Sequence, residues 1–149
     1  MNSDKFPYEI EIEVAFRDID AMGHVNNAVF FAYFETARMK YVMEVLEPGD
    51  PTEFDLLDMP LILVQATCSY KSPALLGETL QVGVGLSRFG TKSFDLVYRI
   101  LGEDGRLIAY GKTVQVMYDY GSRSAYAIPE KIKAQVKTMQ GNWRPPEFA

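Results

Sequence analysis

One long segment restricts more than any other what this chain can fold into. Between positions 27 and 47 a single narrow polar stripe recurs at spacings of four, four and three residues, formed by Thr36, Lys40, Glu44 and Glu47. This spacing predicts an α-helix over residues 27–47 that stops at Pro48-Gly49. Asn26 or Asn27 is expected to cap its start. Because the rest of its circumference is apolar, the helix needs neighbours on several sides.

Five segments in which apolar and polar residues alternate are predicted to be β-strands with one buried face. The first is YEIEIEVAF, which puts Phe16 on the same buried face as Tyr8. The next three have their apolar positions within residues 62–70, 80–86 and 94–100, and the last covers about residues 106–118. Cys68 lies on an apolar face and is expected to pack in the core. A closing helix is expected to begin at Pro129, with one apolar side made by Ile132, Val136 and Met139.

The order of these elements, β-α-β-β-β-β-α, indicates an α+β fold. A flat sheet would cover the long helix on one side only, so a strongly curved antiparallel sheet wrapped around this central helix is the economical arrangement. That arrangement is the hot-dog fold. The length of 149 residues, with 48% hydrophobic and 23% charged residues, predicts a single domain over residues 1–149.

One predicted strand, TLQVGVGLS, has a second face made almost entirely of small residues. Apart from Gln81, this face consists of Thr79, Gly83, Gly85 and Ser87. Small side chains would let another surface approach closely, and glycines in a strand also allow local curvature. The sequence leaves both interpretations open.

Charge and composition restrict the partners of the protein. The net charge of −5 disfavours non-specific nucleic-acid binding, so an anionic ligand needs a local cationic patch. One cysteine and one histidine exclude an internal disulfide and an ordinary zinc site, and we expect no metal. We see no signal peptide and no membrane-spanning run, so a soluble protein in the reducing cytoplasm is expected.

The segment FRDIDAMGHVNNAVF, residues 16–30, gathers polar residues between the first strand and the long helix. It contains Asp18, Asp20 and His24, the only histidine of the chain. Either aspartate could simply form an Asx-turn before the helix, and the asparagines could serve as caps. Alternatively, a carboxylate held beside the free N–H groups of a helix start could form a functional site.

Three stretches carry a family resemblance. RDIDAMGHVNNAVFFAYFETAR, YKSPALLGETLQV and TKSF, in this order, resemble the acyl-CoA thioesterases of the hot-dog superfamily, in the 4-hydroxybenzoyl-CoA thioesterase-like group. The HVNN portion also resembles plant acyl-ACP thioesterases, which have an asparagine where this chain has Met22. The resemblance implies that the chain hydrolyses acyl-CoA thioesters to a carboxylic acid and free CoA.

The resemblance also implies roles for individual residues. Asp20 would be the nucleophile or general base, and the backbone N–H of Asn27 would polarise the thioester carbonyl. Gly23 would permit close backbone approach to the substrate, and His24 is a second catalytic candidate. The hairpin cations Arg88 and Lys92 are candidates for the CoA phosphates. Asp18 is expected to be structural. The resembling enzymes pair edge to edge, so a homodimer or homotetramer is expected, without any cofactor besides the CoA of the substrate.

Other functions remain open from the sequence. The substrate could be an acyl carrier protein conjugate, or the domain could bind acyl thioesters without turnover, because a fold does not guarantee an activity. A dehydratase or hydratase is weaker, because the chain has no recognisable hydratase motif.

Overall fold

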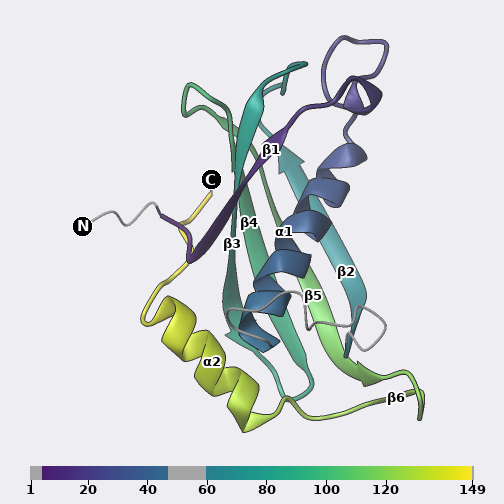
Figure 1. Ribbon diagram of the computed structural model, residues 1–149, viewed down its shortest axis with the longest axis vertical. Helices are drawn as coiled ribbons and strands as arrows, with labels where there is room; N and C mark the ends of the chain where they lie inside the picture. Colours follow the sequence, from purple (N-terminus) through teal and green to yellow (C-terminus); the bar gives the residue numbers. More distant parts are fainter. Residues whose placement is uncertain (1–4, 47–59, 149) are drawn as a thin grey trace.

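A curved antiparallel sheet and two α-helices build the part of the chain that the computed structural model describes, residues 5–46 and 60–148 (Figure 1). The sheet has six strands in the order β1-β3-β4-β5-β2, and the short β6 pairs with β5. The elements are β1 (Tyr8–Glu13), the 3₁₀ turn η1 (Phe16–Asp18), α1 (Val29–Leu46), β2 (Leu61–Tyr70), β3 (Thr79–Phe89), β4 (Ser93–Leu101), β5 (Leu107–Asp119), β6 (Ser124–Ala125) and α2 (Glu130–Gln140). This is the predicted hot-dog fold. The predicted Glu47 and Pro48-Gly49 lie outside the described residues.

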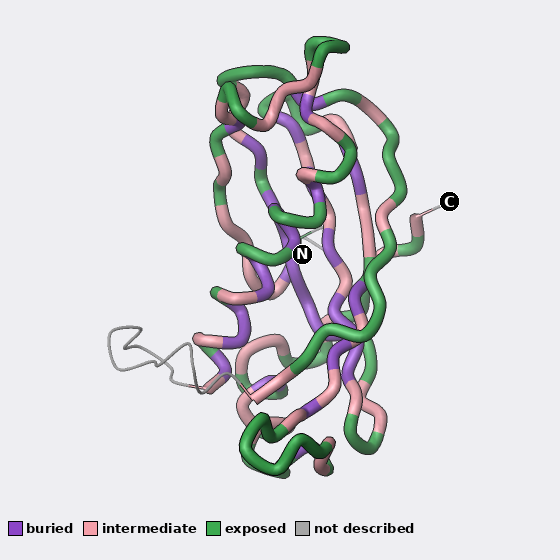
Figure 2. Tube along the Cα trace, turned by 90° about the vertical axis from the view of Figure 1, so that its right-hand side faces the viewer, coloured by how far each residue is buried: buried purple, intermediate pink, exposed green. Residues whose placement is uncertain are grey.

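Helix α1 lies across one face of the sheet, and the core lies between them (Figure 1). From α1, Phe34 and Ala37 are fully buried, and the ring of Phe34 stacks on that of Tyr98 in β4 at 4.5 Å between centroids. The apolar faces of β3 and β4 are also buried, as their alternation predicts. Figure 2 shows that the buried segments run through the middle of the molecule, whereas the connections at both ends are largely exposed.

Helix α2 closes one end of the molecule. Pro129 precedes it, as predicted, and Val136 is buried. The side-chain amide of Gln140, at its last turn, donates to the carbonyl of Leu86 at 2.8 Å, and its oxygen accepts from the hydroxyl of Tyr41 at 2.8 Å. These hydrogen bonds tie α2 to both β3 and α1.

Strand β2 departs from its predicted burial. It lies at the edge of the sheet, and Ile62, Val64 and Tyr70 on its predicted inner face are 37%, 57% and 44% exposed. A register shift between Leu63 and Gln65 also interrupts its alternation against β5. Cys68 is half-buried and packs against the core, so only this position follows the prediction. An edge strand lacks a neighbour on one side, and alternation alone does not reveal this.

The first strand ends earlier than predicted. β1 stops at Glu13, and the backbone N–H of Ala15 donates to the Asp18 carboxylate at 3.0 Å, which folds residues 16–18 into the turn η1. The turn directs Phe16 to solvent, where it is 82% exposed. The prediction that Phe16 shares the buried face of β1 is therefore wrong, because a side-chain cap ends the strand before this residue.

The small-residue face of β3 receives aromatic side chains from both ends of the chain. A Cβ at Gly83 would lie 2.7 Å from the Phe6 ring, and one at Gly85 would lie 2.5 Å from the Trp143 ring. The two rings lie against each other, 5.0 Å between centroids. Close approach of another surface is therefore confirmed at these glycines, and that surface belongs to the same chain.

Candidate active site

A tight turn between η1 and α1 holds Asp20. Ile19 and Val25 form an isolated antiparallel bridge, and inside it the N–H of Asp20 donates to the carbonyl of His24 at 3.1 Å. Gly23 has φ of +88°, a conformation that glycine adopts without strain. Oδ1 of Asp20 accepts the N–H of Met22 at 2.9 Å, so Asp20 does form an Asx-turn. Its second oxygen, Oδ2, accepts no hydrogen bond from the described residues and remains available for chemistry.

Asp18 has a structural role, as expected. Its Oδ2 accepts hydrogen bonds from the N–H of Ala15 at 3.0 Å and from the hydroxyl of Tyr33 at 2.9 Å. Burial, and then the hydrogen bond to Asp18, raise the pKa of Tyr33, so this hydroxyl stays a donor. The carbonyl of Asp18 accepts the N–H of Asn26 at 2.9 Å, which joins the turn to the helix start.

The start of α1 includes a backbone N–H that has no acceptor among the described residues. Oδ1 of Asn26 accepts the N–H of Ala28 and its carbonyl accepts the N–H of Val29, each at 2.9 Å, so Asn26 is the residue that caps the helix. The helix begins at Val29, two residues later than predicted. Among the described residues, no acceptor takes the N–H of Asn27. This N–H is therefore an unsatisfied donor at the positive end of the helix dipole.

Asp20, His24 and Asn27 line the same open cavity of about 480 Å³. The structure thus brings together the three residues predicted to act on the thioester, and Gly23 lies in the turn between two of them. His24 is half-buried, with Nδ1 3.3 Å from the carbonyl oxygen of Val25. The remaining lining residues come from the same turn, from α1, from the end of β2 and from the loop after it: Met22, Val25, Phe30, Tyr70, Lys71, Ser72 and Pro73.

Tyr70 and Lys71 were missed as site residues, although they open the YKSP motif. The Tyr70 hydroxyl donates to the carbonyl of Asn27 at 2.8 Å, across 43 positions of sequence. The ammonium of Lys71 lies 5.7 Å from the centre of the Tyr110 ring. Lys71 adds a cation to the cavity. Because the chain has a net charge of −5, an anionic ligand would need such a local positive charge to bind.

The loop that contributes Ser72 and Pro73 is held by Arg106. Its Nη1 lies 2.6 Å from Oε2 of Glu78, and its Nη2 donates to the carbonyl of Pro73 at 2.7 Å. The other carboxylate oxygen of Glu78 accepts the N–H of Leu75 at 3.1 Å. The hydrogen bond from Arg106 is the main cause that lowers the pKa of Glu78. Glu78 thus helps to hold the loop that forms one wall of the cavity, although Glu78 itself does not line the cavity.

Arg88 and Lys92 lie far from Asp20 within one chain. They flank the β3–β4 hairpin, whereas Asp20 lies beyond the opposite end of β3, where Val14 bonds to Glu78. Arg88 is also engaged, because its guanidinium pairs with the buried carboxylate of Asp95 at 3.3 Å. The structure of a single chain therefore does not bring these two cations to the cavity.

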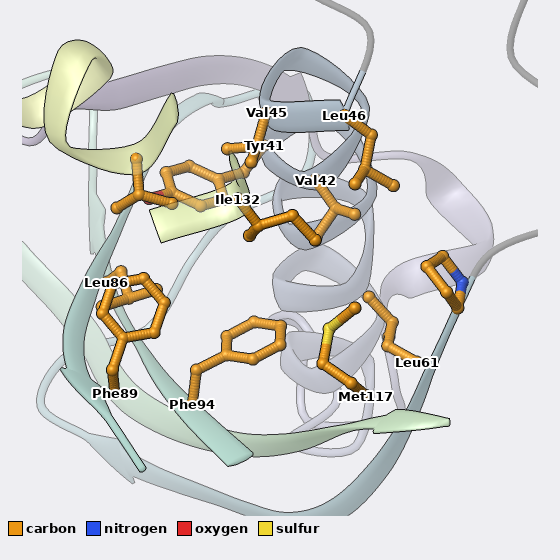
Figure 3. A pocket seen from close by; sticks show the side chains of 12 residues that line it. Tyr41, Val42, Val45, Leu46, Leu61, Leu86, Phe89, Phe94, Met117 and Ile132 are labelled. Atoms are coloured by element: carbon orange, nitrogen blue, oxygen red, sulfur yellow. The ribbon is translucent and has the colours of Figure 1, made fainter. Parts of the chain in front are cut away.

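A second cavity lies at the other end of α1 and is wholly different in character (Figure 3). Its volume is about 20 Å³, and every side chain around it is apolar apart from the Tyr41 hydroxyl. Residues of α1, α2 and four strands point toward one another there, among them Val45, Leu86, Phe94 and Ile132. Among the described residues around it, Tyr41 is the one titratable group, and burial raises the pKa of its hydroxyl, so we assign this cavity a packing role.

Within residues 5–46 and 60–148, no cluster of three or more histidine, cysteine, aspartate or glutamate side chains is arranged to hold a metal ion. In the same residues no helix has both the length and the apolar character needed to cross a membrane.

A long helix packed against a curved antiparallel sheet is the architecture of the hot-dog fold, and here a carboxylate and a free N–H at the helix start line one cavity. The chain belongs to the Thioesterase-like superfamily, whose family model matches residues 14–136. The resemblance seen in the sequence is thereby confirmed, and the protein is a thioester hydrolase.

Individual relatives agree with this assignment. A thioesterase from Thermus thermophilus, crystallised with coenzyme A and zinc, is 30% identical over 96% of this chain and 99% of its own, with a TM-score of 0.81. The long-chain acyl-CoA thioesterase FadM of Escherichia coli K12 is 25% identical over 88% of this chain and 98% of that protein. The 1,4-dihydroxy-2-naphthoyl-CoA thioesterase from Synechocystis shares the fold, with a TM-score of 0.74 at 20% identity, over 87% of this chain and 94% of its own.

Proposed function

We propose that the protein is an acyl-CoA thioesterase in which Asp20 activates the attack and the N–H of Asn27 stabilises the oxyanion. The observation behind this proposal is that Oδ2 of Asp20 and the N–H of Asn27 both lack a partner among the described residues and belong to residues that line one cavity. The coenzyme A bound by the Thermus relative and the acyl-CoA named for FadM support CoA as the carrier.

The reaction needs a base and an oxyanion donor, and the site offers both. The thioester carbonyl would accept the N–H of Asn27, whose donor strength is reinforced by the helix dipole. Asp20 would take a proton from water as the resulting hydroxide attacks the carbonyl carbon. When the C–S bond breaks, the CoA sulfur would leave with that proton, releasing the acid and free CoA. Asp20 could instead attack the carbonyl carbon directly and expel the CoA thiolate, forming a mixed anhydride; water would then cleave this anhydride, releasing the acid and supplying the proton that the thiolate takes up.

His24 would have a supporting role. When its Nδ1–H donates to the carbonyl of Val25, Nε2 is the neutral acceptor nitrogen. An acceptor in the wall of this cavity can orient the attacking water toward Asp20.

The proposed reaction uses no metal and no cofactor besides the CoA of its substrate. We place it in the cytoplasm, where the single thiol of Cys68 stays reduced.

A panel of acyl-CoA esters with a thiol-trapping reagent tests the proposal. We expect thiol release far above the rate without enzyme, for at least one acyl group, aliphatic or aromatic. Binding of acyl-CoA without thiol release would instead identify a non-catalytic binding domain. Release from acyl carrier protein conjugates alone would replace CoA by a protein carrier.

We also propose that two copies pair through the free edge of β2. Ile62, Leu63 and Val64 are exposed along this edge strand, and an exposed apolar edge otherwise promotes aggregation. Two-fold antiparallel pairing would set the Leu61 end of one β2 beside the Tyr70 end of the other. Within one chain, Leu61 pairs with Met117 of β5, and the N–H of Met117 donates to the carbonyl of Lys92, so Lys92 lies near the Leu61 end of β2. This pairing would therefore bring the partner's Lys92 toward the Tyr70 end of β2, where the cavity lies. Light scattering should give twice the mass of one chain, and a monomer at micromolar concentration would exclude this assembly.

A further inference from the structure

The hydroxyl of Tyr70 makes a hydrogen bond whose acceptor is the residue that supplies the oxyanion donor. It donates to the carbonyl of Asn27 at 2.8 Å. The Tyr70 ring lies against Phe30, in the first turn of α1, at 5.3 Å between centroids and 68° between planes. The end of β2 is thereby joined to the start of α1 at two points, by one polar contact and one apolar contact.

Asn27 has few other restraints. It precedes the first residue of α1, it is exposed, and its own N–H has no acceptor among the described residues. The residues on either side of it are held, because Asn26 donates to the carbonyl of Asp18 and Ala28 donates to the side chain of Asn26. The peptide unit that carries the N–H of Asn27 is held at the carbonyl of Asn26, which accepts the N–H of Val29, and the bond from Tyr70 holds the following unit at the carbonyl of Asn27.

We infer that Tyr70 is a positioning residue, whose hydroxyl fixes the carbonyl of Asn27 and thereby the Cα that joins this peptide unit to the one whose N–H points at the oxyanion. This inference rests on the proposed function. An oxyanion donor must lie about 2.7–3.1 Å from the position where the charge develops, so a small rotation of the backbone weakens it. A misplacement of about 1 Å near reacting atoms can cost on the order of a hundredfold in rate.

The surroundings of Tyr70 keep its hydroxyl in the donor form. Burial raises its pKa, and the neighbouring Cys68 thiol raises it further. The hydroxyl therefore keeps its proton at neutral pH and goes on donating to Asn27.

Tyr70→Phe tests the inference, because it removes the hydroxyl and leaves the ring against Phe30. We expect kcat for acyl-CoA to fall about tenfold, with KM and the unfolding midpoint nearly unchanged, since the lost contact acts on the transition state. Tyr120→Phe is the matched control. Tyr120 is 55% exposed, against 44% for Tyr70, and its hydroxyl donates to the carbonyl of Leu61, at the other end of β2, at 2.9 Å. This variant should retain full kcat.

A CoA thioether that lacks the carbonyl oxygen separates positioning from a change in cavity shape. It should bind wild type and Tyr70→Phe with equal Kd, because it presents no oxygen to Asn27. An unchanged kcat in Tyr70→Phe would overturn the inference. A rise in KM alone, or weaker thioether binding, would make Tyr70 an ordinary substrate contact and also overturn it.

Backbone amide spectra keep the inference testable even if the proposed function fails. If wild type hydrolyses no acyl-CoA, the proposed function is wrong, but Tyr70→Phe should still shift the amide resonances of Asn27 and Ala28. Tyr120→Phe should leave them in place. Unmoved resonances in Tyr70→Phe would show that the hydroxyl does not hold this backbone, and they would refute the positioning role independently of any activity.

Discussion

The two ends of helix α1 lie in opposite surroundings. Around its first residues a carboxylate, an imidazole and a free N–H line an open cavity of about 480 Å³. Around its last turns, apolar side chains from α1, α2 and the sheet close on a cavity of only about 20 Å³. At the start of the helix a backbone N–H has no hydrogen-bond acceptor among the described residues, whereas apolar side chains pack tightly around the other end. We therefore expect substitutions at the first end to change activity and those at the second to change stability.

The largest expected effect separates the two aspartates at the active end. Asp20→Asn keeps the size of the side chain but removes the base, so kcat should fall at least ~10²-fold with acyl-CoA binding retained. Asp18→Asn should cost far less in kcat but should destabilise the turn by roughly 1 kcal/mol, because Asp18 accepts from Ala15 and Tyr33. Steady-state kinetics and chemical denaturation measure both. If Asp18→Asn abolishes turnover while Asp20→Asn remains active, the roles are reversed.

At the packed end, Val136→Ala should act on stability alone. Val136 is 4% exposed and lines the apolar cavity, so losing its two methyl groups should lower the free energy of unfolding by about 2 kcal/mol. Urea denaturation gives this value, and kcat/KM measured well below the midpoint should match wild type. Lys137→Ala, at the neighbouring exposed position, should change stability by less than about 0.5 kcal/mol. A large loss of kcat in Val136→Ala would mean that the two ends of α1 are coupled.

A third test acts on the loop that borders the active cavity. Glu78→Gln removes the charge that Arg106 pairs with, and we expect a loss of about 1 kcal/mol at pH 7, since Arg106 keeps Asp104 and Pro73 as partners. The folded-state pKa of Glu78 is lowered, so its contribution is present above the unfolded pKa of about 4.3 and is lost as pH falls through the folded pKa. The difference in free energy of unfolding between wild type and Glu78→Gln should therefore disappear below about pH 4. A difference that is independent of pH would contradict the role of this ion pair.

The smallest effect tests whether a second copy supplies cations to the cavity. Lys92→Ala should raise KM for acyl-CoA roughly two- to fivefold, weaken its salt dependence and leave kcat unchanged, as expected for a uniform binding contact. Lys131→Ala, an exposed cation on α2, is the control. Arg88 is a poorer target, because its removal leaves the buried carboxylate of Asp95 unpaired. An unchanged KM in Lys92→Ala would place the phosphates elsewhere, with Lys71 the next candidate.

The sequence predicts the central elements well and the edge poorly. Strands β3 and β4 have neighbours on both sides, so their alternation matches their burial. Strand β2 has similar alternation but lies at the edge, and a strand's place in the sheet depends on pairings that local pattern does not contain. The prediction for Phe16 is wrong for another reason, because the hydrogen bond from the N–H of Ala15 to the carboxylate of Asp18 ends the strand before Phe16.

The same distinction holds for the site. Asp20 and Asn27 lie within seven residues of each other, and the chemistry of a helix start is sufficient to connect them. Tyr70 lies 43 positions away from Asn27 and reaches it only because β2 ends beside the start of α1. Arg88 and Lys92 show the opposite case. The family resemblance made them candidates for binding the CoA phosphates, but within one chain they lie at the end of β3 that is far from Asp20.

The contact of Phe6 and Trp143 over the glycines of β3 bears on where this folding unit can be cut. The family match spans residues 14–136, which leaves out both aromatic side chains and the whole of β1. A chain trimmed to those limits would lose β1, one of the two neighbours of β3, and expose the surface around Gly83 and Gly85. Trimming on the C-terminal side alone, before Trp143, would leave the ring of Phe6 without its aromatic neighbour. We therefore expect the smallest piece of this protein that folds by itself to be longer at both ends than the range matched by the family model.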